Sequence, residues 1–192
     1  MSLTMHTATV PTCTRALNSL AAILEKAAAH AEARKIDPAA LLGTRLFPDM
    51  LPLASQIQIA NDIAQGGAAR LAGAEVPVFE QKQRTITEWI AATRGTIAYL
   101  ESLKPAQFEG SEERTVTWQT RTSTKNMQGT PYLFHHVLPN VFFHVTTAYD
   151  ILRQSGLDIG KMDYLGKAII SEPSPQRSQL GPTPPRSDGD GS

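Results

Sequence analysis

The sequence predicts an all-α protein built from four long amphipathic helices. Apolar residues recur at spacings of three and four in four separate segments, which is typical of helices with one buried face. Proline or glycine stands near the ends of these segments, where helices usually begin or stop. Hydrophobic residues make up 41% of the 192 residues, enough for a packed core. We therefore expect a helical bundle.

The first helix is expected over residues 11–34, because Pro11 suits a first turn, where its missing N–H needs no partner. Its buried stripe consists of residues three or four apart: Cys13, Leu17, Leu20, Leu24, Ala27 and Ala31. A short second helix is expected from Asp37-Pro38 through Leu42, since aspartate before proline is a strong start signal.

The third helix is expected to begin near Asp49, because Pro48 and Pro52 belong before or within a first turn. Its core stripe has the same spacing: Leu53, Ile57, Ala60 and Ala64. The adjacent glycines Gly66 and Gly67 are candidates to loosen or interrupt this helix.

The fourth helix is expected over residues 83–103, where Thr85 and Glu88 match a capping box. Its buried side carries Ile86, Ile90, Thr93, Ile97 and Leu100. Between residues 105 and 130 the period changes, and apolar and polar residues alternate over residues 115–119. That alternation predicts a short hairpin or extended excursion before the last helix.

The final long helix lies in an aromatic- and histidine-rich segment from Pro131 to Gly156. Its expected buried stripe is Val141, Val145, Ala148 and Leu152. His144 lies one residue from that stripe and Tyr149 just after it, so polar groups stand at the edge of the core. Pro139 either kinks the helix or marks its true start.

The chain is interpreted as one bundle domain over residues 1–170, followed by a disordered tail over residues 171–192. The tail is dominated by proline, serine, glycine and aspartate, and it has almost nothing to bury.

Composition excludes several classes of function. Lysine plus arginine equals aspartate plus glutamate at 18 each, so the broad basic surface of a dedicated nucleic-acid binder is absent. No stretch approaches the roughly 20 apolar residues of a membrane span, and the first ten residues do not resemble a signal peptide. The single cysteine, Cys13, is interpreted as a core residue in a reducing compartment. We expect a soluble, cytoplasmic protein.

Seven polar side chains are candidates for one pocket at the end of the bundle. His144 and Tyr149 are the predicted catalytic residues, since a histidine titrates near working pH and can act as general acid or base. The predicted substrate-binding residues are Arg45, Asp49, Gln56, Asp163 and Tyr164, the last two as a lid over a small-molecule substrate. In a structural interpretation, by contrast, Arg45 and Asp49 only brace a turn and His144 is a hydrogen-bonded core residue.

No metal site is predicted from the residues, and no cofactor is expected. His135, His136 and His144 lie within ten residues, but the sequence has no His-x-x-x-His, Glu-x-x-His or Cys-x-x-Cys pair. A divalent metal held by His144 with His135 or His136 is the alternative.

Five motifs in order carry a family resemblance: RLFPDM at 45–50, SQIQIAND at 55–62, RLAG at 70–73, PNVFFHVTTAYDILRQSG at 139–156 and GKMDYLG at 160–166. Together they resemble a domain-of-unknown-function branch of the DinB-like (YfiT-like) superfamily, over residues 5–166. The resemblance implies a four-helix bundle of up-down-down-up connectivity, often paired into homodimers.

The resemblance also has implications for the site. Better-known relatives bind a divalent metal with three histidines and include thiol transferases and maleylpyruvate isomerase-like enzymes. On this pattern His144 falls at one ligand position, with Asn140 or Val141 and Gln56 or Asn61 at the others. None of these other residues is histidine.

The sequence thus favours a small-molecule-binding bundle, with metal-free isomerase or cyclase chemistry of secondary metabolism around His144 as the leading hypothesis. The alternatives are a metal-dependent DinB-like transferase or isomerase, and a noncatalytic dimeric binding or interaction protein.

Overall fold

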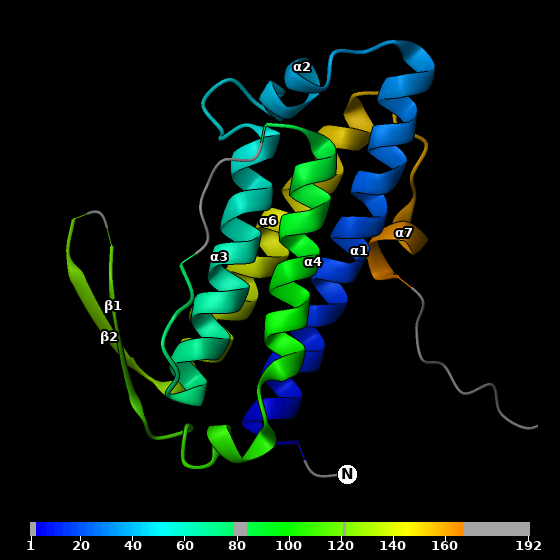
Figure 1. Ribbon diagram of the computed structural model, residues 1–192. Helices are drawn as coiled ribbons and strands as arrows, with labels where there is room; N and C mark the ends of the chain where they lie inside the picture. The colour runs from blue at the N-terminus through cyan, green and yellow to red at the C-terminus, as the bar shows by residue number, and fades with distance from the viewer. Residues whose placement is uncertain (1–2, 79–83, 121, 167–192) are drawn as a thin grey trace, which may run out of the picture.

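In the computed structural model, which describes residues 3–78, 84–120 and 122–166, the protein is predominantly helical, as predicted (Figure 1). The long helices pack side by side: α1 (Met5–Arg34), α3 (Leu53–Ala72), α4 (Ile86–Ser102) and α6 (Leu138–Gln154). The shorter helical segments are α2 (Pro38–Gly43), η1 (Pro105–Phe108), α5 (Gly129–Tyr132), η2 (Leu133–Val137) and α7 (Lys161–Leu165). The predicted tail lies outside the described residues.

The hairpin predicted before the last helix is also confirmed. Strands β1 (Thr115–Gln119) and β2 (Thr124–Gln128) pair antiparallel, with Val116 opposite Met127 and Trp118 opposite Lys125. The ribbon projects from the side of the helices, near the end of α3 and the start of α6 (Figure 1).

Helix α1 begins at Met5, so the predicted start at Pro11 is wrong. The side chain of Thr4 accepts a hydrogen bond from the Thr7 amide at 3.2 Å, and the Thr7 hydroxyl accepts one from the Thr4 amide at 2.8 Å. This reciprocal cap satisfies two amides that would otherwise lack partners at the helix start. Pro11 therefore lies inside the helix, where it costs one intrahelical hydrogen bond.

Helix α3 begins at Leu53 rather than near Asp49, because the segment around Asp49 forms a turn closed by the Met50 amide on the Phe47 carbonyl at 3.0 Å. The helix then runs without interruption through Gly66 and Gly67, contrary to prediction. A Cβ on Gly67 would lie 2.7 Å from the side chain of Val137, so this glycine permits close packing.

The long helices enclose one apolar core. The predicted stripe of α6 is buried, with Val141, Ala148 and Leu152 fully inaccessible and Val145 only 1% exposed. Cys13 is also buried, and burial raises the pKa of its thiol to about 12, so it is a core residue as predicted.

Contacts between helices give their directions. Glu25, in the second half of α1, pairs with Arg94 in the middle of α4, and the ring of His6 lies 3.3 Å from the carbonyl of Leu103 just after α4. Helices α1 and α4 are therefore antiparallel. Gln56, in the early part of α3, contacts His144 in the middle of α6, and Arg70, in the last turn of α3, contacts Tyr132 in α5, which precedes α6. Helices α3 and α6 are therefore antiparallel as well.

Pro139 lies near the start of α6, directly after a π turn. The segments α5, η2 and α6 follow one another without a break, and the amide of Leu138 donates to the carbonyl of Leu133, five residues earlier. A π turn widens the helix at the place where the ring of Pro139 would meet the preceding turn. Within the described ranges, no helix is both long and apolar enough to cross a membrane.

Candidate functional site

Gln56 and His144 form a polar pair between α3 and α6, in which the glutamine is buried and the histidine half-buried. Gln56 is 2% exposed, and its Oε1 lies 2.7 Å from Nδ1 of His144. The other end of the amide, Nε2, donates to the carbonyl of Leu51 at 3.0 Å. Because a carbonyl can only accept, the amide nitrogen must face Leu51 and the amide oxygen must face the ring.

This hydrogen bond assigns the tautomer of His144. The Gln56 oxygen accepts, so Nδ1 of His144 carries a hydrogen and donates. Burial lowers the pKa of His144, which keeps the ring neutral at pH 7. A neutral ring with a hydrogen on Nδ1 has its lone pair on Nε2. His144 therefore has the form of a general base.

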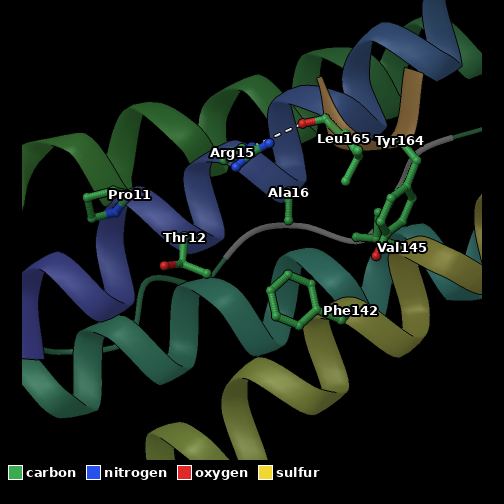
Figure 2. Close-up of a pocket in the computed structure, with 8 residues that line it drawn as sticks. All are labelled: Pro11, Thr12, Arg15, Ala16, Phe142, Val145, Tyr164 and Leu165. Carbon is green, nitrogen blue, oxygen red and sulfur yellow. Dashed lines mark hydrogen bonds between the residues drawn. The ribbon is translucent and has the colours of Figure 1, made fainter. Parts of the chain in front are cut away.

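A cavity of about 410 Å³ lies between α1, α6 and α7 (Figure 2). It is lined by residues of all three helices, most of them apolar: Pro11, Thr12, Arg15, Ala16, Phe142, Val145, Tyr164 and Leu165. The polar groups are the hydroxyl of Thr12, the guanidinium of Arg15 and the hydroxyl of Tyr164. Its size and lining suit a small, largely apolar molecule.

Helix α7 lines one side of this cavity and is fixed to its neighbours. The guanidinium Nε of Arg15 donates to the carbonyl of Leu165 at 3.0 Å (Figure 2). The ammonium of Lys26 lies 2.5 Å from the carboxylate of Asp163. Hydrogen bonds from Lys26 and from the Gly160 amide lower the pKa of Asp163. Asp163 therefore anchors the helix, whereas Tyr164 reaches the cavity.

The structure divides the seven predicted site residues into three places. Gln56 and His144 are in contact. Tyr149 packs edge-on against Tyr164 with ring centroids 6.0 Å apart, near Asp163 on α7. His144 and Tyr149 point to different sides of α6, because five residues advance a helix by about 140° beyond a full turn. His144 does not line the cavity under α7.

Arg45 and Asp49 lie in the exposed loop before α3. The guanidinium of Arg45 donates to the carbonyl of Met50, and its backbone carbonyl accepts from Nε2 of Gln154 at 2.9 Å. Among the described contacts, Arg45 has no ion pair with Asp49. Neither residue lines the cavity, and no contact of either with His144 is found among the described residues.

The residues present do not fit a three-histidine metal centre. Of the expected ligand positions only His144 is histidine, and its Nδ1 is used by Gln56. The amide of Asn61 donates to the carbonyl of Ile57 at 2.8 Å and to the hydroxyl of Thr93 at 3.1 Å. In the part of the chain that the structure describes, no three histidine, cysteine, aspartate or glutamate side chains converge.

Sequence reasoning missed the residues of α1 that line the cavity. Thr12, Arg15 and Ala16 come together with Tyr164 and Leu165 only because α7 folds back onto α1. No local pattern reports that contact, since the two segments are 150 residues apart. The sequence signal for this cavity is Phe142, a large apolar residue that lies off the predicted buried stripe of α6. In the structure Phe142 is 40% exposed.

The fold is that of a DinB-like helical domain. A family model described as a domain of unknown function (DUF1993) matches residues 5–165, and the chain belongs to that family. A crystal structure at 1.83 Å of a DinB family member protein from Shewanella denitrificans is similar, with 36% sequence identity and a TM-score of 0.81. The match covers 88% of this chain and 95% of that one. Comparison with curated proteins finds no match.

Proposed function

We propose that this protein is a four-helix bundle of up-down-down-up connectivity that binds a small organic molecule in the cavity under α7. The antiparallel pairs α1–α4 and α3–α6 support the connectivity. The cavity of about 410 Å³ carries the functional proposal, because small-molecule sites commonly measure roughly 300–1,000 Å³ and have mostly apolar walls with a few polar groups.

The polar groups of this cavity give the bound molecule an orientation. The Nε of Arg15 donates to Leu165, and among the described residues no acceptor faces its two terminal nitrogens, so both can donate to an acceptor on the ligand. The hydroxyl of Tyr164 accepts from Thr146 at 2.9 Å and retains its own hydrogen to donate. Phe142 and Val145 supply the apolar contacts.

Filling the cavity tests this proposal. Ala16 is 8% exposed and lines the cavity, so Ala16→Leu places three more carbons where the ligand would lie. The neutral dye N-phenyl-1-naphthylamine, whose fluorescence rises in apolar surroundings, is a suitable probe. We expect Ala16→Leu to weaken dye binding by about tenfold or more, since steric exclusion removes the apolar contacts.

The matched control is Ala22→Leu, on the exposed side of the same helix, which should leave dye binding unchanged. Equal binding by Ala16→Leu and the unsubstituted protein would place the dye elsewhere and contradict the proposal. Native mass spectrometry of the freshly purified protein then identifies any small molecule that remains bound.

Proton transfer by His144 is the second candidate function, and the tautomer fixed by Gln56 favours it. With Nδ1 donating to Gln56, Nε2 acts as the base in a metal-free isomerisation or cyclisation. This function requires a substrate that reaches Nε2, which is a different position from the cavity under α7. Once a substrate is known, loss of turnover in His144→Asn with retained binding supports the proposal.

A further inference from the structure

A second polar cluster lies where the last turn of α3 meets α5 and β1. Arg70 is half-buried there, and its Nη1 lies 3.3 Å from the hydroxyl of Tyr132. No carboxylate among the described residues pairs with Arg70. A half-buried charge normally has an opposite charge nearby, because removing it from water is costly. The positive charge of Arg70 is thus available to an anion.

The helix is shaped to receive the guanidinium. A Cβ on Gly66 would lie 2.6 Å from Nη1 of Arg70, so the guanidinium occupies the place of the missing side chain. Gly66 is buried, one turn before Arg70 on the same helix. Any larger residue at position 66 would push the guanidinium away. The direction of the Arg70 side chain is therefore built into α3.

Tyr132 places a second donor beside the guanidinium. Its side chain is 1% exposed, and burial, the largest influence, raises the pKa of its hydroxyl, so the proton stays on at neutral pH. Arginine can only donate, so in the contact with Arg70 the Tyr132 oxygen accepts. The hydroxyl hydrogen has no acceptor among the described residues. Besides this hydroxyl hydrogen, the N–H groups of Arg70 that do not face Tyr132 have no acceptor among the described residues.

Aromatic rings form a wall next to these donors. The ring of His136 stacks on Tyr132 with centroids 5.3 Å apart and lies 4.7 Å from the ring of Trp118 on β1. His136 and Trp118 are both half-exposed, so a ligand can reach them. Burial first, and the charge of Arg70 second, lower the pKa of His136, which keeps its ring neutral. His136 lies on the π turn, a feature frequent at functional sites.

We propose that Arg70 and Tyr132 form a binding site for the carboxylate of a small aromatic acid whose ring lies against Trp118 and His136. The planar guanidinium and one hydroxyl match the two oxygens of a monoanion. Arg70 supplies a single positive charge, so we expect this site to prefer a carboxylate monoanion to a phosphate dianion. This site is separate from the cavity under α7 and does not depend on the function proposed for that cavity.

Calorimetric titration with benzoate tests this site. Arg70→Met removes the charge while keeping an apolar stem, and we expect benzoate affinity to fall by about tenfold or more. Tyr132→Phe removes the hydroxyl alone and should weaken binding several-fold. Benzamide, which has the same ring without the charge, should bind weakly and without dependence on Arg70.

Gly66→Ala keeps the charge of Arg70 but displaces its guanidinium, so it should weaken benzoate binding, though by less than Arg70→Met does. Gly95→Ala is the matched control, since a Cβ there has no atom within 4 Å, and it should bind benzoate normally. Circular dichroism confirms that each variant is folded. If Arg70→Met does not fold, the comparison of Gly66→Ala with Gly95→Ala decides.

Three results would overturn the proposal: no benzoate binding by the folded protein, benzoate affinity in the variants at Arg70 and Gly66 that is unchanged from the unsubstituted protein, or competition by inorganic phosphate as strong as that by benzoate. Loss of benzoate binding in Ala16→Leu would also overturn it, by placing the acid in the cavity under α7.

Discussion

At the scale of single residues, Gln56 determines the chemical state of His144. The glutamine is fixed at one end by the Leu51 carbonyl, so its oxygen has one direction in which to accept. His144 is consequently a donor at Nδ1 and a base at Nε2. A hydrogen-bond donor in the place of this oxygen would favour the opposite tautomer.

Replacing this glutamine changes the proton affinity of His144 in a predictable direction. Gln56→Glu places a carboxylate next to Nδ1, and an opposite charge favours the protonated ring, so we expect the pKa of His144 to rise. Titration of the imidazole signals by NMR measures it. Gln128→Glu, on an exposed residue of β2, is the control and should leave the pKa of His144 unchanged.

The two half-buried histidines also predict how stability depends on pH. Burial lowers the pKa of His136 and of His144 in the folded state, whereas in the unfolded chain both return to about 6.5. Below that pH the unfolded chain takes up protons that the folded protein resists, so the free energy of unfolding falls from pH 7.5 to 5.5. The two histidines contribute fully to the free energy of unfolding above the pKa of the unfolded chain, and this contribution is lost as pH decreases.

Urea denaturation at both pH values checks this prediction. The double variant His136→Gln, His144→Gln should show a weaker dependence on pH. Burial raises the pKa of Asp62, which acts in the opposite direction, but this contribution is common to both proteins and drops out of their difference. A pH dependence that is the same in both proteins would contradict the assignment.

At the scale of secondary structure elements, the two adjacent glycines of α3 have separate packing roles. Gly66 makes room for the guanidinium of Arg70, and Gly67 makes room for the side chain of Val137 on the π turn. Glycine within a helix is destabilising, but at each of these two positions a larger side chain would collide with a neighbouring side chain.

A methyl group at Gly67 should therefore destabilise the protein. Gly67→Ala places a Cβ 2.7 Å from Val137, and overpacking of this kind costs typically 1–3 kcal/mol. Adding Val137→Ala should relieve the collision, so the double variant should be more stable than the two single effects predict. Thermal and urea unfolding of the four proteins give the coupling energy.

Gly95→Ala provides the control on an open helix surface. A Cβ there meets no atom within 4 Å, so the change should stabilise the protein by about 0.5–1 kcal/mol through reduced freedom of the unfolded chain. Equal effects at Gly67 and Gly95 would show that helix propensity, rather than contact with Val137, determines the result.

At the scale of the whole molecule, the cavity exists because a short helix near the end of the described chain returns to the first one. Helix α7 is attached to α1 through Asp163 and Lys26 and through Leu165 and Arg15, and to α6 through Tyr164 and Thr146. These contacts are partly exposed, so the attachment is weaker than the core beneath it.

Asp163→Asn should release α7 without unfolding the bundle. Asparagine removes the charge that attracts Lys26 but keeps an oxygen for the Gly160 amide, which lies 2.8 Å from the carboxylate. The paired side chains are 51% and 26% exposed, so the loss of stability should stay below about 1 kcal/mol. Hydrogen exchange over residues 160–166 should become faster.

The matched control is Asp158→Asn, which affects an exposed pair with Arg153 at 3.6 Å outside α7. It should not change exchange in α7. Unchanged exchange in Asp163→Asn would mean that the contacts of Leu165 and Tyr164 hold the helix by themselves.

The sequence by itself determined the helical class, the buried stripes, the capping box at Thr85 and the hairpin at β1. These features depend on residues that are close together along the chain, so the spacing of those residues in the sequence predicts them. Local signals failed at the start of α1, where a less usual cap begins the helix, at the start of α3, where a turn precedes it, and at Gly66 and Gly67, where glycine permits close packing.

Only the tertiary structure decided which side chains meet. His144 contacts Gln56 across 88 residues, Arg15 meets Leu165 across 150, and Arg70 reaches Tyr132 across 62. Periodicity tells which face of a helix is buried, but not which helix covers it or at what height along its axis. Those choices depend on the simultaneous packing of all the helices, and they determine the cavity and both polar clusters.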